Sequence, residues 1–208
     1  MTARLRRIGL LAHILSAVGW LGAVVAYLAL AIAGLWSQDT QIARSAYLSM
    51  GLLGGSVIVP FSIATLLTGL IQSLGTEWGL LRHYWILTKF LMTAGATAVL
   101  LMHMGTVRQM AAIAVQTATF GADLGEMRLK LLVHAGGGLL VLVMATALSV
   151  FKPWGRTRFG ERGLEAVGSA RRWSPSHSRG ALVLLGIVAL GLLLLAHHQF
   201  GGGLHNRH

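Results

Sequence analysis

The chain has 208 residues, of which 55% are hydrophobic and 11% charged, and its mean hydropathy is +0.69. This composition excludes an ordinary soluble globule and is typical of a polytopic membrane protein. In a soluble protein the formal net charge of +11 would indicate nucleic acid as a partner, but beside such long apolar runs we interpret the excess Lys and Arg as topology and lipid signals and expect no nucleic-acid binding.

The apolar runs predict an all-α membrane bundle with four core transmembrane helices and a fifth, C-terminal one. The first run is far longer than the core of about 7–15 residues that a signal peptide carries, so we expect it to be retained as a helix. The predicted spans are residues 8–36, 49–74, 85–107, 129–151 and 181–196.

Two further features shape the core. Pro60 should kink the second span. The small or polar side chains after it, at Ser62, Thr65, Gly69 and Gln72, form a stripe that is typical of helix–helix packing. Residues 109–128 are too polar to span and are predicted to form an interfacial helix on the outer surface.

Counting Lys and Arg gives the orientation. The N-terminus, the turn at 75–84 and the segment 152–179 hold eleven, whereas the other side holds five. The positive-inside rule therefore predicts a cytoplasmic N-terminus and an outer C-terminus in the bacterial cytoplasmic membrane. The domains expected are a core at 1–151, a basic cytoplasmic loop at 152–179 that contacts anionic lipid, and a fifth helix with a short outer tail at 180–208.

Four ionisable side chains interrupt the predicted spans. Lys89 and His103 are fourteen residues apart on one face of the third span, roughly 21 Å along the helix axis. Alternating helix directions place His13 near the inner surface with Lys89, and His134 near the outer surface with His103. Such residues are costly in a membrane and are candidates for function, although snorkelling or helix packing explains any single one equally well.

The outer histidines predict a cofactor site. Neutral imidazole suits haem iron, copper or zinc. Haem between helices also needs small residues that admit the ring, which the glycines at 136–138 and the Gly95-Ala96 pair supply. We therefore expect a haem at the outer layer, with His103 and His134 as candidate cofactor-binding residues.

Two stretches resemble known membrane families. The segment LLAHILSAVGWLGAVVAYLAL is similar to the first helix of HemJ-type protoporphyrinogen oxidases and of the copper-resistance D membrane domain, and WILTKFLMTAGATAVLLMHM resembles a later helix of both. Residues 1–151 look like an uncharacterised bacterial integral-membrane family related to these two. The HemJ resemblance implies a haem b bundle in which His13 and Lys89 are essential, and therefore a redox or porphyrin-oxidising role.

Two other functions stay open. Met102, His103, Met104 and His134 offer soft ligands near the outer surface, which favours copper or another metal, although methionines in apolar helices are usually core residues. The chain could instead be a non-catalytic membrane scaffold or partner subunit. As protein partners, a second copy of the chain or an electron-transfer partner stays open. No acidic residue lies in mid-span, which argues against a carboxylate-driven ion pump.

Overall fold

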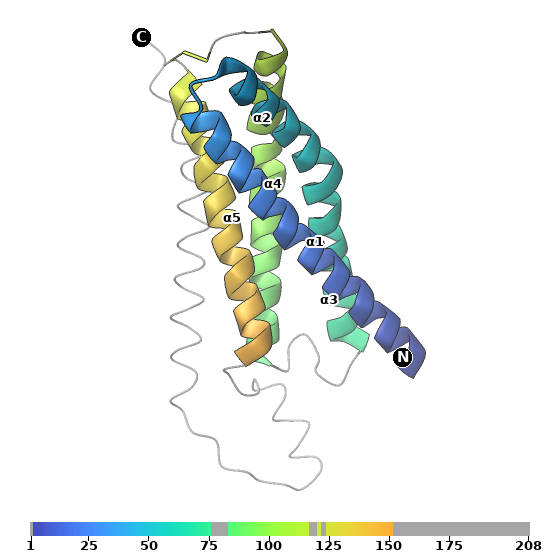
Figure 1. The fold of residues 1–208 in the computed structure, drawn as a ribbon. Coiled ribbons are helices and arrows are strands. Elements are labelled where there is room, and N and C mark those ends of the chain that lie inside the picture. Colours follow the sequence, from blue (N-terminus) through green and yellow to red (C-terminus); the bar gives the residue numbers. More distant parts are fainter. Residues whose placement is uncertain (1, 76–82, 117–119, 122–123, 152–208) are drawn as a thin grey trace, which may run out of the picture.

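The computed structural model describes residues 2–75, 83–116, 120–121 and 124–151 (Figure 1). The predicted basic loop at 152–179 and the predicted fifth helix and tail at 180–208 lie outside these described residues. The four-helix core at 1–151 can be compared with the prediction almost throughout.

The described chain is an all-α bundle, as predicted. Its elements in order are α1 (Ala3–Trp36), α2 (Thr40–Leu53), the π-helical turn η1 (Gly54–Ile58), α3 (Val59–Gly75), α4 (Tyr84–Gln116) and α5 (Gly125–Phe151). Because α2, η1 and α3 run on as one helix, the described residues contain four helices that are long and apolar enough to cross a membrane.

The four spans form a ring rather than a flat layer. α1 packs against α2, α3 and α5, and α4 packs against the same three, whereas the backbones of α1 and α4 do not approach each other among the described residues. α1 and α4 therefore face each other across the bundle axis. Figure 1 shows the start of α1 and the end of α5 at one end of the bundle, with α2 at the other. We call the end that holds the start of α1 the inner end, following the predicted orientation.

The outside of the ring is apolar. Ile8, Val18 and Leu140 each leave more than 60% of their surface exposed. Exposed aliphatic side chains on every long helix would destabilise a water-soluble bundle, but they match lipid. The largest fully buried side chains of the interior include Tyr47, Met50, Met110 and Leu131.

The second span is helical from Thr40, nine residues before its predicted start at residue 49. The predicted disturbance at Pro60 takes the form of η1, in which the Val59 N–H bonds to the Gly54 carbonyl, five residues back. Proline has no N–H to continue the α-helical ladder, and a π turn is one way of accommodating the missing donor. The polar stripe that follows packs inward as expected, since Ser62 and Thr65 are buried.

The prediction of a separate interfacial helix at 109–128 was wrong. α4 continues without a break to Gln116, and α5 begins at Gly125. The extension is amphipathic because Met110 and Ala114 are buried while Gln109 and Gln116 are exposed. It packs against α2 so closely that a Cβ at Gly51 would lie 2.8 Å from the Cβ of Ala111.

Two arginines hold the outer ends of neighbouring helices. Arg44 of α2 donates to the Val115 carbonyl in the last turn of α4, at 2.9 Å. Arg128 of α5 donates to the Gly34 and Leu35 carbonyls in the last turn of α1, at 2.8 and 2.7 Å. The last carbonyls of a helix lack partners of their own and carry partial negative charge, so each guanidinium both satisfies and stabilises them.

Candidate functional site

The inner pair joins the two helices that face each other across the bundle. The Nζ atom of Lys89, on α4, lies 3.4 Å from Nε2 of His13, on α1. Both side chains are partly buried. The long lysine chain reaches across the axis, and the predicted inner layer is therefore a direct contact.

The hydrogen bonds around His13 settle which ring nitrogen carries the proton. The Thr68 hydroxyl donates to the Ala64 carbonyl at 2.6 Å, so its oxygen is left to accept from His13 Nδ1 at 3.1 Å. His13 Nε2 then holds the lone pair and accepts from Lys89. A chain of donors runs from Lys89 through His13 and Thr68 to the backbone of α3.

The outer pair is formed by neighbouring helices. The imidazoles of His103, on α4, and His134, on α5, are stacked, with 4.0 Å between ring centroids and 6° between ring planes. Both residues are buried. His134 Nδ1 donates to the Lys130 carbonyl one turn back, at 2.7 Å. A backbone partner at one nitrogen fixes the tautomer and the ring orientation, as it commonly does for histidines that bind metals.

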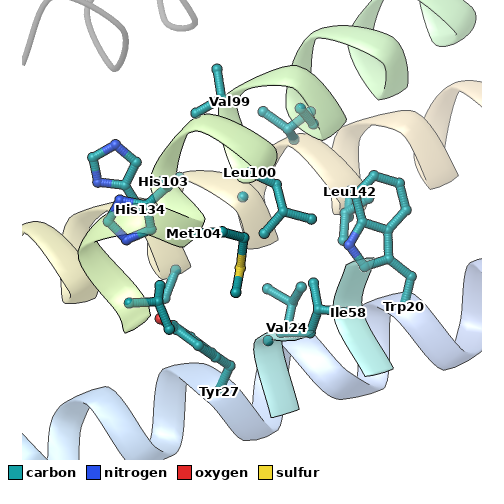
Figure 2. A pocket seen from close by; sticks show the side chains of 17 residues that line it. Trp20, Val24, Tyr27, Ile58, Val99, Leu100, His103, Met104, His134 and Leu142 are labelled. Carbon is teal, nitrogen blue, oxygen red and sulfur yellow. The ribbon is translucent and has the colours of Figure 1, made fainter. Parts of the chain in front are cut away.

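An apolar cavity begins at this pair. We call it the outer cavity; it encloses about 680 Å³ of space, counted with its mouth. Figure 2 shows His103 and His134 side by side at one end and Trp20 and Leu142 at the other. Small residues form part of the wall, namely Gly54, Ala96, Ala135, Gly137 and Gly138.

The two methionines proposed as metal ligands lie on different sides of α4. Met104 is buried and lines the outer cavity with the two histidines, whereas Met102 is 47% exposed and does not line it. Residues two apart on a helix point in widely different directions, so only one could join His103. No cluster of three or more His, Cys, Asp or Glu side chains suited to a metal occurs among the described residues.

Three hydroxyl residues belong to these sites although sequence reasoning did not assign them. Tyr27 lines the outer cavity, and its buried hydroxyl has no hydrogen-bond partner in the described part of the chain. Thr68 orients His13, and Thr65 lies beside the inner pair. Tyr27 follows His13 and Trp20 at steps of seven residues, which was the one available signal for its position.

The four candidate residues form two sites rather than one. Lys89 and His103 lie on the same unbroken helix, fourteen residues and so roughly 21 Å apart. Metal–imidazole bonds are about 2 Å long, so no single metal ion could bind both pairs.

The stacked geometry limits what the outer pair could ligate. A metal held between two imidazoles on opposite sides would place the rings end to end, with two bonds of about 2 Å between the nitrogens. Rings stacked face to face at 4.0 Å cannot take that arrangement. One of the two imidazoles could hold a haem iron, while the other would remain packed against it.

Comparisons of the chain with protein-family models, with curated proteins and with solved structures found no match. The resemblance to HemJ-type oxidases and to the copper-resistance D domain therefore stays a prediction that rests on the residues quoted for it.

Proposed function

We propose that this multi-pass membrane protein binds haem b in the outer cavity and takes part in electron transfer or porphyrin oxidation at the bacterial cytoplasmic membrane. The observation that carries the proposal is His134. Its imidazole is buried, is oriented by the hydrogen bond that Nδ1 donates to the Lys130 carbonyl, and lines an apolar cavity together with His103.

The walls of the cavity support a flat ligand. Gly137 and Gly138 follow His134 by less than a turn and a half and bring no side chain into the space next to the imidazole. The apolar surroundings would keep water from the iron and would influence its reduction potential. When bound, haem would supply a one-electron redox centre, while the protein supplies the ligand and the dielectric environment.

Tyr27 gives the outer cavity a polar contact at a second point. Its buried hydroxyl, without a partner among the described residues, would be satisfied by an oxygen or nitrogen acceptor of the ligand. A purely lipid-filled cavity would leave that hydroxyl unsatisfied.

The optical spectrum of the purified full chain tests the proposal. Protein from haem-replete cells should show a Soret band that shifts on dithionite reduction. Because His103 and His134 are stacked, the ferric spectrum should be that of high-spin, singly ligated iron. His134→Ala should abolish the band, whereas the control His83→Ala, directly before α4, should retain it. A colourless wild-type protein would end the proposal.

A copper site is the second candidate, and Met104 is the observation that favours it. The thioether lines the outer cavity with the two imidazoles, giving three soft or borderline donors. Metal analysis separates the two functions. Met104→Leu should remove bound copper while leaving a Soret band intact, and Met102→Leu, on the exposed face, should change neither.

A further inference from the structure

A second ligand site lies at the inner end of the bundle, where two cavities meet. His13, Thr65, Lys89 and Thr93 line both of them. We call the joined space the inner chamber. One arm runs between α1 and α5 toward Trp20, and the other runs between α3 and the start of α4.

The lysine in this chamber retains donors that the protein does not use. An ammonium group has three N–H donors, and His13 Nε2 takes one of them at 3.4 Å. The described residues offer no other hydrogen bond to Nζ. Two N–H donors of Lys89, which lines the chamber, therefore have no acceptor among the described residues.

The positive charge of Lys89 has no counter-charge in the described part of the chain. That part contains two carboxylates, Asp39 and Glu126. Asp39 accepts from the Gln41 N–H at the start of α2, and Glu126 pairs with Lys130 at 2.8 Å. Both lie at the outer ends of their helices, far from Lys89. A cation within a membrane bundle ordinarily faces a partner or a ligand of opposite charge.

Thr65 gives independent evidence for a ligand. Its side chain is 4% exposed, and its hydroxyl is buried without a hydrogen-bond partner. It lines both arms of the inner chamber beside Lys89. A buried hydroxyl without a partner is unfavourable, and an acceptor oxygen placed between Thr65 and Lys89 would satisfy both groups.

The arm toward Trp20 is suited to hydrocarbon. Ala17, Leu21 and Leu142 line it, and it passes beside Ile14 and Val18, which are 48% and 63% exposed on the apolar outside of the bundle. A chain held in this arm could therefore continue into the surrounding lipid.

We propose that the inner chamber binds the carboxylate of a long-chain amphiphile, such as a fatty acid of the inner leaflet. One carboxylate oxygen accepts from Lys89 and the other from Thr65, and the hydrocarbon chain occupies the arm toward Trp20. Two oxygens match the donors available, whereas a phosphate would bring more acceptors than this site has donors. The site is separate from the outer cavity and does not depend on haem binding there.

Equilibrium binding to the purified full chain in detergent tests this site with oleate as the probe. Oleate should bind saturably, with one molecule per chain. Oleyl alcohol, which lacks the carboxylate, and butyrate, which lacks the long hydrocarbon chain, should bind about tenfold more weakly or not at all. Lys89→Met should weaken oleate binding by at least about tenfold and Thr65→Val by about threefold or more. The matched control Lys130→Met, at the outer end, should bind as the wild type does.

Lys89→Arg keeps the proposal testable if the methionine variant does not fold. It retains the charge, so oleate affinity should stay within about threefold of the wild type. Equal binding of oleate and oleyl alcohol, or wild-type affinity in Lys89→Met, would overturn the proposal. Tighter binding of lysophosphatidate with the same chain would overturn the choice of a carboxylate headgroup.

Discussion

His13 of the inner site and His134 of the outer site each use Nδ1 in a hydrogen bond, but the partners differ. His13 donates this proton to a threonine hydroxyl, and His134 donates it to a backbone carbonyl. In each case Nε2 is left with the lone pair. His13 Nε2 meets the Lys89 ammonium, whereas His134 stands beside an apolar cavity. The two imidazoles therefore have the same tautomer but different surroundings: a lysine at His13 and an apolar cavity at His134.

The ring of Tyr47 packs so closely against Gly34 that no larger side chain fits at this position. A Cβ there would lie 2.7 Å from Cζ of Tyr47, whose hydroxyl also accepts from Arg128 at 2.8 Å. Gly34→Ala should therefore displace the ring and lower the free energy of unfolding by about 1–3 kcal/mol. Thermal unfolding in detergent measures the effect. Gly22→Ala is the control, since a Cβ there meets nothing within 4 Å. Equal midpoints for the two variants would contradict this account of Gly34.

At the scale of the element, the outer end of the bundle is held by cations on helix ends. Arg128 alone contacts two carbonyls of α1 and the Tyr47 hydroxyl of α2, and so connects three helices. Counting charge for topology could not show this use of Arg44 and Arg128. Both guanidinium groups bind carbonyls at the ends of neighbouring helices instead of contacting lipid headgroups.

Arg128→Met should destabilise the core more than removal of an exposed arginine. The substitution leaves the Gly34 and Leu35 carbonyls without their donor. Because hydrogen bonds to charged groups are stronger than neutral ones, we expect the free energy of unfolding to fall by about 3 kcal/mol. Arg108→Met, on the exposed side of α4, should change the unfolding midpoint little. The same thermal measurement compares them, and a wild-type midpoint in Arg128→Met would show that the contacts are dispensable.

Hydropathy predicted which segments are helices, but not where each helix ends. α4 was expected to stop near residue 107, because the residues beyond it include Arg108, Gln109 and Gln116. It continues because Met110 and Ala114 find a packing surface on α2, a tertiary contact that a window of sequence cannot contain.

The inner and outer pairs could be predicted from depth alone, since antiparallel helices bring residues of matching height together. The stacking of His103 on His134 could not, nor could the outward direction of Met102. Both depend on the rotation of each helix about its axis, which packing decides. The binding of haem or copper stays a prediction.

At the scale of the whole molecule, the ring of helices places the two sites at opposite ends of one bundle. Trp20 and Leu142 line both the outer cavity and one arm of the inner chamber, so they form the wall between the sites. The four antiparallel spans put the start of α1, the end of α3, the start of α4 and the end of α5 at the same end (Figure 1). Orientation in the membrane therefore decides which compartment each site faces.

Because the chain has no cysteine, its orientation can be mapped with single substitutions. Gln38→Cys and Gly121→Cys lie in the connections at the outer end and are exposed, so an impermeant maleimide should label them on intact spheroplasts. Thr2→Cys, at the inner end, should be labelled only after permeabilisation. The opposite pattern would reverse the assignment of inner and outer for both sites.

The π turn at Gly54–Ile58 also governs where the second span can tolerate a change of length. At about 100° per residue, Ser62 would lie about 120° round an uninterrupted α-helix from Met50, yet both are buried. If the π turn accommodates one extra residue, only eleven of the twelve steps from Met50 to Ser62 rotate the helix, and the angle between the two side chains falls to about 20°. The turn therefore keeps both residues on the buried face. A homologue shortened by one residue here would keep both halves facing the bundle, whereas a deletion between Val59 and Ala64 would rotate Thr65 and Gly69 by about 100° relative to α2. Insertions and deletions among relatives should therefore collect at this turn.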